Sequence, residues 1–395
     1  MKNNIRLSRS IVGQAEAEAV SRVLLEDGYL GMGKEVQTFE EEIAKFLEVP
    51  RDWVICVNSG TAALHLAVQT LTRPDDEVLV QALTYVASFQ AIKATGAIPV
   101  ACEVIPENIT LDLDDAAKRL STRTKIVMPV HYASNPGDLA AIYEFAKHHG
   151  LRVIEDAAHA FGCLYHGHKI GSQELLNQLY GNSPSSVVCF SFDGIKNITS
   201  GEGGVVITQD PFVAQKIRDA RLLGVEQDTE KRYSGQRSWE FDVQQQGYRY
   251  HMSNIFAAIG RVQLQRLSNE FAPKRRAWAC LYRAKLKSIA GIKFLQSDLD
   301  SIIPHIQPIL VPAIHRDSLR QYLSDKGIET GIHYMPNHLL TFFGDRNDRL
   351  PVTEQLYEEL LSLPLHPGLT ESDVNYVTDR VSEFGAATFP VDGND

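Results

Sequence analysis

The sequence predicts an α/β protein with a large domain on a mixed, mostly parallel sheet and a smaller α+β domain at the C-terminal end. From about residue 50 to 210, short β-rich apolar runs alternate with amphipathic helical segments. That rhythm requires crossover connections, which place helices over a largely parallel sheet. The chain has 395 residues and 44% apolar content, so we expect two domains of unequal size.

The strand pattern recurs seven times before residue 210. The predicted strands are 53–57, 77–80, 98–102, 125–130, 151–155, 187–192 and 203–207. The first of them is followed by Asn58-Ser59-Gly60 and then by a helical pattern with good capping residues. Open α/β sheets bind ligands at the ends of such strands.

The second half of the chain is less regular. Residues 225–250 are polar and aperiodic, which predicts an extended loop of a length that is often functional. A long helix is predicted from Ser253 to about Leu267. Helix and short strand then alternate over 307–311, 316–326, 354–363 and 371–384. We therefore expect a large domain over 1–265, a small domain over 266–385 and a disordered tail over 386–395.

Composition excludes several classes of protein. A net charge of -10 gives no general attraction for nucleic acid or anionic membrane. Five scattered cysteines without CxxC spacing suggest reduced, mostly buried thiols, and we predict no metal site. No signal peptide or membrane span is recognisable, so we expect a cytoplasmic protein.

Lys196 lies between an apolar strand and a glycine-rich turn, in Phe-Ser-Phe-Asp-Gly-Ile-Lys-Asn-Ile-Thr-Ser-Gly-Glu-Gly-Gly. Partial removal of an ammonium group from water lowers its pKa, and a neutral amine is what attacks an aldehyde to form a Schiff base. An exposed loop lysine is the alternative interpretation for any single lysine. The residues that we expect around Lys196 favour the interpretation as a reactive amine.

Asp156 ends a predicted strand and should lie at the same edge of the sheet as Lys196. A carboxylate beside a pyridine nitrogen favours the protonated ring, which then withdraws electrons. A helix N-cap is the structural alternative for this aspartate. Tyr85, after the second predicted strand, is a candidate to stack on a flat heterocycle or, equally, a core aromatic.

Ser-Gly-Thr-Ala-Ala provides a third element of the predicted site. Gly60, Thr61 and Ala62 would present free backbone N–H groups at a helix N-terminus, which suits a phosphate. The hydroxyl of Ser191 could add another donor. By itself this motif is weak, because many strand-to-helix turns look like it.

Taken together, these residues resemble the DegT/DnrJ/EryC1/StrS family of nucleotide-sugar aminotransferases, which have the aspartate-aminotransferase fold (fold type I). The resemblance covers nearly the whole chain. Its motifs are Gly-Tyr-Leu-Gly-Met-Gly near 28, Ser-Gly-Thr-Ala-Ala-Leu at 59, Thr-Tyr-Val-Ala-Ser at 84, Glu-Asp-Ala-Ala-His-Ala at 155, Phe-Ser-Phe with Lys196 and Gly-Glu-Gly-Gly, and His-Tyr-Met-Pro-Asn-His at 333.

The resemblance implies pyridoxal 5'-phosphate as cofactor, with a pyridoxamine form during turnover. Lys196 resembles the Schiff-base lysine and general acid/base, Asp156 the partner of the pyridine nitrogen, and Tyr85 the stacking residue. The implied phosphate contacts are Gly60, Thr61 and Ser191. His159 would lie near the phenolic oxygen of the cofactor, unless it is a satisfied buried histidine.

Two positions depart from the family pattern. Where the family often has asparagine, in a residue that reaches the cofactor phosphate of the partner subunit, this chain has Arg249 in Gly-Tyr-Arg-Tyr-His-Met. That arginine could bind the phosphate or the sugar-nucleotide pyrophosphate. Ser134 replaces a usual glycine. The resemblance also implies a homodimer with shared active sites.

The expected reaction moves an amino group from L-glutamate to a nucleotide-linked keto-sugar, favoured at C4 of a dTDP- or UDP-4-keto-6-deoxyhexose, in deoxyamino-sugar biosynthesis for surface polysaccharide. Amination at C3, sugar dehydration or a non-catalytic regulator are the alternatives. A nucleotide-dependent oxidoreductase is disfavoured because GxGxxG is missing after the first strand. Candidate substrate contacts, which could also be solvated surface, are Arg237, Trp239, Arg249, His333, Tyr334 and His338.

Overall fold

A computed structural model describes residues 4–180, 186–344 and 349–389. Its centre is a seven-stranded sheet in the order β1-β9-β8-β5-β4-β2-β3. The strands are β1 Val54–Val57, β2 Glu77–Gln81, β3 Ile98–Cys102, β4 Thr124–Met128, β5 Arg152–Asp156, β8 Ser186–Ser191 and β9 Gly204–Ile207. β9 is antiparallel to both of its neighbours, and the other pairings are parallel. The predicted α/β class and the mostly parallel mixed sheet are confirmed.

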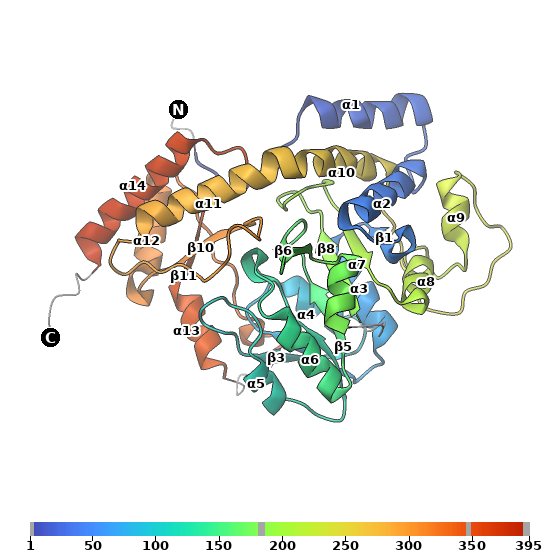
Figure 1. Ribbon diagram of the computed structural model, residues 1–395, viewed down its shortest axis with the longest axis horizontal. Helices are drawn as coiled ribbons and strands as arrows, with labels where there is room; N and C mark the ends of the chain where they lie inside the picture. Colours follow the sequence, from blue (N-terminus) through green and yellow to red (C-terminus); the bar gives the residue numbers. More distant parts are fainter. Residues whose placement is uncertain (1–3, 181–185, 345–348, 390–395) are drawn as a thin grey trace.

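Helices cover both faces of this sheet, which explains why its strands are nearly continuous apolar runs. On one face, side chains such as Ile154 and Val187 pack under α3 (Gly60–Leu71), α4 (Val86–Lys93) and α8 (Pro211–Ala220). On the other face, Val153 and Val188 pack under α2 (Lys34–Leu47), α6 (Leu139–His149) and α7 (Gln173–Tyr180). The result is a three-layer sandwich (Figure 1).

One long helical run joins the sheet to the C-terminal part of the chain. α10 (Asn254–Arg266) continues through a π-helical turn, Leu267–Phe271, into α11 (Ala272–Leu286). Figure 1 shows this run extending along much of the length of the molecule, with α1 (Gln14–Arg22) beside α10. Because the helix is nearly uninterrupted, the domain boundary near residue 265 stays a prediction.

The C-terminal part has its own apolar core, which includes Tyr282, Leu319 and Val377. It contains an antiparallel pair, β10 (Gln307–Leu310) and β11 (Leu360–Leu363), and the helices α12 (Ala313–Asp325), α13 (Pro351–Glu359) and α14 (Glu371–Thr388). Two predictions need correction. The segment 354–363 contains both a helix end and a strand, and the last helix continues to Thr388 with Phe389 buried behind it, so a tail from 386 begins too early.

Smaller elements complete the described residues. A hairpin of β6 (Leu164–Tyr165) and β7 (His168–Lys169) and the short helix α5 (Leu113–Lys118) were not predicted. Four cysteines are buried and Cys280 is exposed, all of them as free thiols. Within the described residues, no helix combines the length and the apolar character that a membrane crossing needs.

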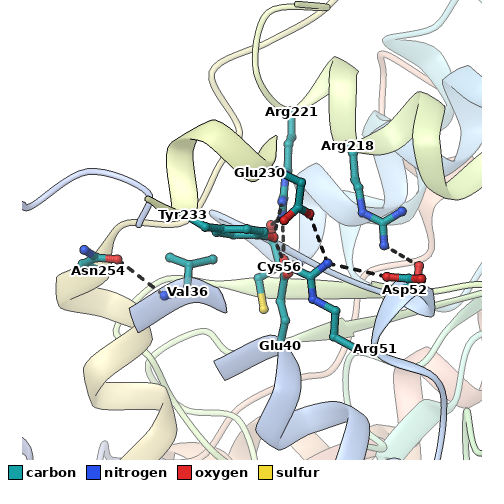
Figure 2. Close-up of polar contacts among 10 residues, drawn as sticks. All are labelled: Val36, Glu40, Arg51, Asp52, Cys56, Arg218, Arg221, Glu230, Tyr233 and Asn254. Carbon is teal, nitrogen blue, oxygen red and sulfur yellow. Dashed lines mark hydrogen bonds and ion pairs between the residues drawn. The ribbon is translucent and has the colours of Figure 1, made fainter. Parts of the chain in front are cut away.

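The polar segment 225–250 is anchored by a buried ionic cluster that involves Glu40, Arg221 and Tyr233 (Figure 2). The segment is not wholly extended, because it contains α9 (Asp228–Tyr233). The carboxylate of Glu40 on α2 accepts from the Arg221 guanidinium at 2.7 Å and from the Tyr233 hydroxyl, and it also accepts from the backbone N–H of Cys56 in β1. The cluster therefore ties this segment to the sheet.

Candidate active site

The parallel strands β1, β2, β4, β5 and β8 all end at one edge of the sheet, and a cavity of about 450 Å³ lies there. Strand ends from different parts of the chain meet at such an edge, which makes it the usual ligand site of open α/β sheets. The predicted residues that line the cavity are Gly60, Thr61, Tyr85, Asp156, His159, Ser191, Lys196, His333 and Tyr334. Their positions agree with the prediction, and their individual roles stay predictions.

Lys196 is held by a tight loop between β8 and β9. Its backbone N–H donates to the carbonyl oxygen of Asp193 at 3.1 Å, and Ser200 N–H donates to the carbonyl oxygen of Phe192. Burial lowers the pKa of Lys196 to about 8, even though the nearby carboxylates of Asp193 and Asp156 act in the opposite direction. A useful fraction of the amine is therefore neutral near physiological pH, as an attack on an aldehyde requires.

Asp156 is the last residue of β5 and is 5% exposed. Its carboxylate accepts from the Ser88 hydroxyl at 2.6 Å and from the Ala158 N–H at 3.2 Å. Burial raises the pKa of Asp156, and these two hydrogen bonds and the positive charge of Lys196 oppose that rise. A carboxylate held in this way is a fixed partner for a protonated ring nitrogen. It does not cap a following helix, so the N-cap alternative is wrong.

The N-terminus of α3 and the end of β8 form a cradle for a small anion. The Ser59 side chain accepts from Ala62 N–H at 3.0 Å. The prediction of a free donor at Ala62 is therefore wrong, because this N–H already has a partner. A Cβ on Gly60 would lie 2.7 Å from the Cβ of Ser191, so these two residues are as close as a glycine allows. Backbone N–H groups and a hydroxyl at a helix N-terminus suit a phosphate.

Two tyrosines and two histidines also line the cavity. The ring of Tyr85 is 56% exposed and lies 5.4 Å from that of Tyr334 between centroids, so Tyr85 is not a core aromatic. The Tyr334 hydroxyl lies 3.2 Å from Nε2 of His159. Burial lowers the pKa of His159 well below its usual range and that of His333 to about 4, so both are neutral hydrogen-bonding groups.

Four predicted residues lie outside the cavity wall. Arg237, Trp239 and Arg249 are exposed on the segment 225–250, with Trp239 86% exposed. His338 is only 3% exposed, and its Nε2 lies 3.3 Å from the Glu354 carboxylate. The proposed substrate contact of His338 does not fit this position, because its buried ring is already paired with Glu354 on α13.

Several lining residues were not predicted. Asp193 and Glu202 bring two carboxylates to the cavity, and the charge of Asp193 adds to burial in raising the pKa of Glu202. Asp193 lies three residues before Lys196, so its place in the motif was a usable signal. Ser88, which fixes the Asp156 carboxylate, ends the motif Thr-Tyr-Val-Ala-Ser, but its role was not predicted, because its hydroxyl meets Asp156 only through the packing of α4 against the sheet.

These groups match the three functional parts of pyridoxal phosphate. An amine of lowered pKa suits its aldehyde, a buried carboxylate suits its ring nitrogen, and a cradle that a Cβ at Gly60 would fill suits its phosphate. The fold and the site thus define a pyridoxal-phosphate-dependent enzyme of fold type I.

Comparison with known proteins agrees with this class. The model of the DegT/DnrJ/EryC1/StrS aminotransferase family matches residues 11–382, and the chain belongs to that family. It is similar to the dTDP-4-dehydro-2,3,6-trideoxy-D-glucose 4-aminotransferase of Saccharopolyspora spinosa, with 34% identity over 95% of each chain. The chain is therefore a pyridoxal-phosphate-dependent sugar aminotransferase.

Solved structures are similar over almost the full length. The aminotransferase TlmJ from Streptoalloteichus hindustanus matches with a TM-score of 0.87 and 33% identity, over 97% of this chain and 99% of that one. The putative sugar aminotransferase Spr1654 from Streptococcus pneumoniae, in its PLP form, matches with a TM-score of 0.85 and 25% identity, over 97% of this chain and 99% of that one.

Proposed function

We propose that the chain transfers the amino group of L-glutamate to C4 of a dTDP- or UDP-linked 4-keto-6-deoxyhexose, in deoxyamino-sugar biosynthesis for surface polysaccharide. The observation that carries the proposal is the convergence of Lys196, Asp156 and the Gly60–Ser191 cradle on one cavity at the sheet edge. The similarity to a 4-aminotransferase over 95% of the chain supports C4 rather than C3.

The residues of the chain have separable tasks in this reaction. Pyridoxal phosphate, when bound, supplies an aldehyde that takes up the amino group and a ring that withdraws electrons. Asp156 would hold a proton at the ring nitrogen, while Gly60, Thr61 and Ser191 would hold the phosphate. Lys196, with its pKa near 8, accepts and returns the proton at the carbon atom that carries the amino group.

Neutral hydrogen-bonding groups are available for the sugar. Nδ1 of His333 lies 2.8 Å from the Ser362 hydroxyl, which fixes the orientation of the imidazole ring at the cavity wall. The Tyr334 hydroxyl is positioned by Nε2 of His159. Because the pKa values of both histidines are lowered, these groups orient hydroxyl or keto oxygens of a sugar without adding charge.

We infer that the working unit is a homodimer. Among the cavity-lining residues that the structure describes, Lys196 is the only lysine or arginine, and the wall also carries Asp156, Asp193 and Glu202. A nucleotide pyrophosphate needs additional cations. Arg237 and Arg249 are exposed and lie away from the cavity of their own chain. A second copy of the chain could bring them to it.

The test is to incubate the purified protein with ¹⁵N-labelled glutamate and a panel of 4-keto and 3-keto sugars linked to dTDP, UDP or GDP. We expect ¹⁵N in an aminosugar product from a 4-keto substrate, and none with Lys196→Ala. Label in products of 3-keto substrates alone would move the reaction to C3. Loss of water without label transfer would identify a dehydratase, and no turnover with any sugar would favour a regulator.

A further inference from the structure

A buried arginine, Arg275 on α11, contacts the loop between β8 and β9 that carries Lys196, which we call the lysine loop. Arg275 is 79 residues distant from Lys196 in the sequence. The residue is 2% exposed. Its Nη2 donates to the carbonyl oxygens of Ile195 and Lys196, each at 3.4 Å. The guanidinium therefore holds the peptide groups on both sides of the lysine, the one that leads into Lys196 and the one that follows it.

The other amino group of the same guanidinium faces the small domain. Nη1 of Arg275 donates to the carbonyl oxygens of Pro304 at 3.3 Å, His305 at 3.1 Å and Leu365 at 3.4 Å. His305 is buried, and its ring packs 4.4 Å from that of His159 in the cavity wall. One side chain thus connects the lysine loop, a wall histidine and the small domain.

The charge of this arginine has no counter-ion among the described residues. No carboxylate within the described residues lies at ion-pair distance from Arg275, whereas most other buried arginines, such as Arg221, have one. Burial lowers the pKa of Arg275 to about 10, so it stays protonated at neutral pH. Carbonyl dipoles alone stabilise the cation, and its field extends to its neighbours.

We propose that Arg275 is a positioning residue for Lys196, which clamps the lysine loop to the C-terminal part of the chain and places a positive charge close to the lysine amine. The inference rests on the proposed role of Lys196, but its test uses the free amine and requires no turnover. A failure of the sugar assay and a failure of this test are therefore distinguishable.

Other charged or titratable groups act on the same amine. Asp193 and Asp156 favour its protonated form, and Arg275 opposes them. The facing histidines, His159, His305 and His333, have lowered pKa values and are neutral at pH 7. Removing the arginine charge should therefore shift the titration of Lys196 upward, and removing the Asp193 charge should shift it downward.

The experiment measures the labelling rate of Lys196 by dilute acetic anhydride as a function of pH, in the full chain stripped of cofactor, with peptide mass analysis. For Arg275→Met we expect the labelling midpoint to rise by about one pH unit, which means about tenfold slower labelling at pH 7. Arg275→Lys keeps the charge and should shift the midpoint much less. It should still accelerate amide hydrogen exchange at 195–197, because an ammonium cannot span all five carbonyl oxygens.

Arg276→Met is the matched control. Arg276 is the neighbour of Arg275 on the same helix, donates from its own Nε to the Ile302 carbonyl oxygen at 2.8 Å and does not reach the lysine loop. Asp193→Asn serves as the reverse perturbation if Arg275→Met does not fold. A midpoint that moves equally in the Met variants of Arg275 and Arg276 would overturn the proposal. The proposal would also be overturned if the labelling midpoint of Lys196 shifted upward in Asp193→Asn, or if hydrogen exchange at 195–197 were unchanged in Arg275→Lys.

Discussion

The sharpest structural prediction concerns Tyr233, whose hydroxyl closes the buried cluster in Figure 2. That hydroxyl accepts from Nη2 of Arg221 at 2.9 Å and donates to the carboxylate of Glu40. Both partners are fully buried, so neither can exchange the lost bond for water. Tyr233→Phe removes both hydrogen bonds and keeps nearly the whole ring.

The magnitude follows from the charge of the two partners. Hydrogen bonds to charged groups contribute about 1.5–3 kcal/mol each, so the two lost bonds would together cost about 3–6 kcal/mol. The Arg221–Glu40 ion pair survives the substitution and compensates about half of this, so we expect a net cost of about 1.5–3 kcal/mol. Since Tyr233 ends α9, the cost should appear as local opening of the segment 225–250. The open population should rise by about ten- to a hundredfold.

Limited trypsin digestion measures this opening, because the segment contains Lys231, Arg232 and Arg237. Tyr248→Phe is the matched control, since Tyr248 lies on the same segment and its hydroxyl has no polar partner in the described part of the chain. We expect cleavage of Tyr233→Phe to be about ten- to a hundredfold faster than that of the wild type. Equal cleavage rates for the two variants would refute the anchoring role of the cluster.

Three further predictions test the site. Asp156→Asn removes the negative charge that would stabilise a protonated ring nitrogen, so stopped-flow absorbance should show the glutamate half-reaction slowed at least about tenfold, and an unchanged rate would contradict the role of Asp156. Gly60→Ala places a Cβ 2.7 Å from that of Ser191, and overpacking of about 1–3 kcal/mol should weaken cofactor binding in a titration by about five- to a hundredfold. Gly13→Ala, with open space around it, should not weaken it. In cofactor-free protein, Lys196→Met should raise the melting temperature. The pKa of Lys196 is lowered to about 8 in the folded state, so burial of the charged lysine destabilises the folded protein fully below that pH. The increase in melting temperature should therefore be largest below pH 8 and decline toward pH 10. An increase that does not change with pH would be evidence against the lowered pKa.

Much of the site could be predicted because it depends on strand ends. Asp156 and Ser191 each end an apolar run, and parallel strands bring such ends to one edge whatever the details of packing. Lys196 follows within a few residues of one of them, so local sequence was enough to place it. The same reasoning located the cradle at Gly60.

The parts that escaped prediction depend on contacts between distant segments. Arg275 lies in a stretch for which no element was predicted, and only the packing of α11 against the lysine loop shows its five carbonyl partners. His338 belonged to a motif of the family, yet its ring faces Glu354. In the polar segment 225–250, the anchor at Tyr233 was missed because a buried partner such as Glu40 has no local signature.

The most direct test of the central claim is to reduce the cofactor-loaded protein with borohydride and to map the labelled peptide by mass. Reduction fixes the cofactor to the amine that held it. We predict a single labelled site, at Lys196, and loss of the label in Lys196→Ala. Label on a different lysine, or none on position 196 in protein that retains its bound cofactor, would contradict the proposed chemistry of this site.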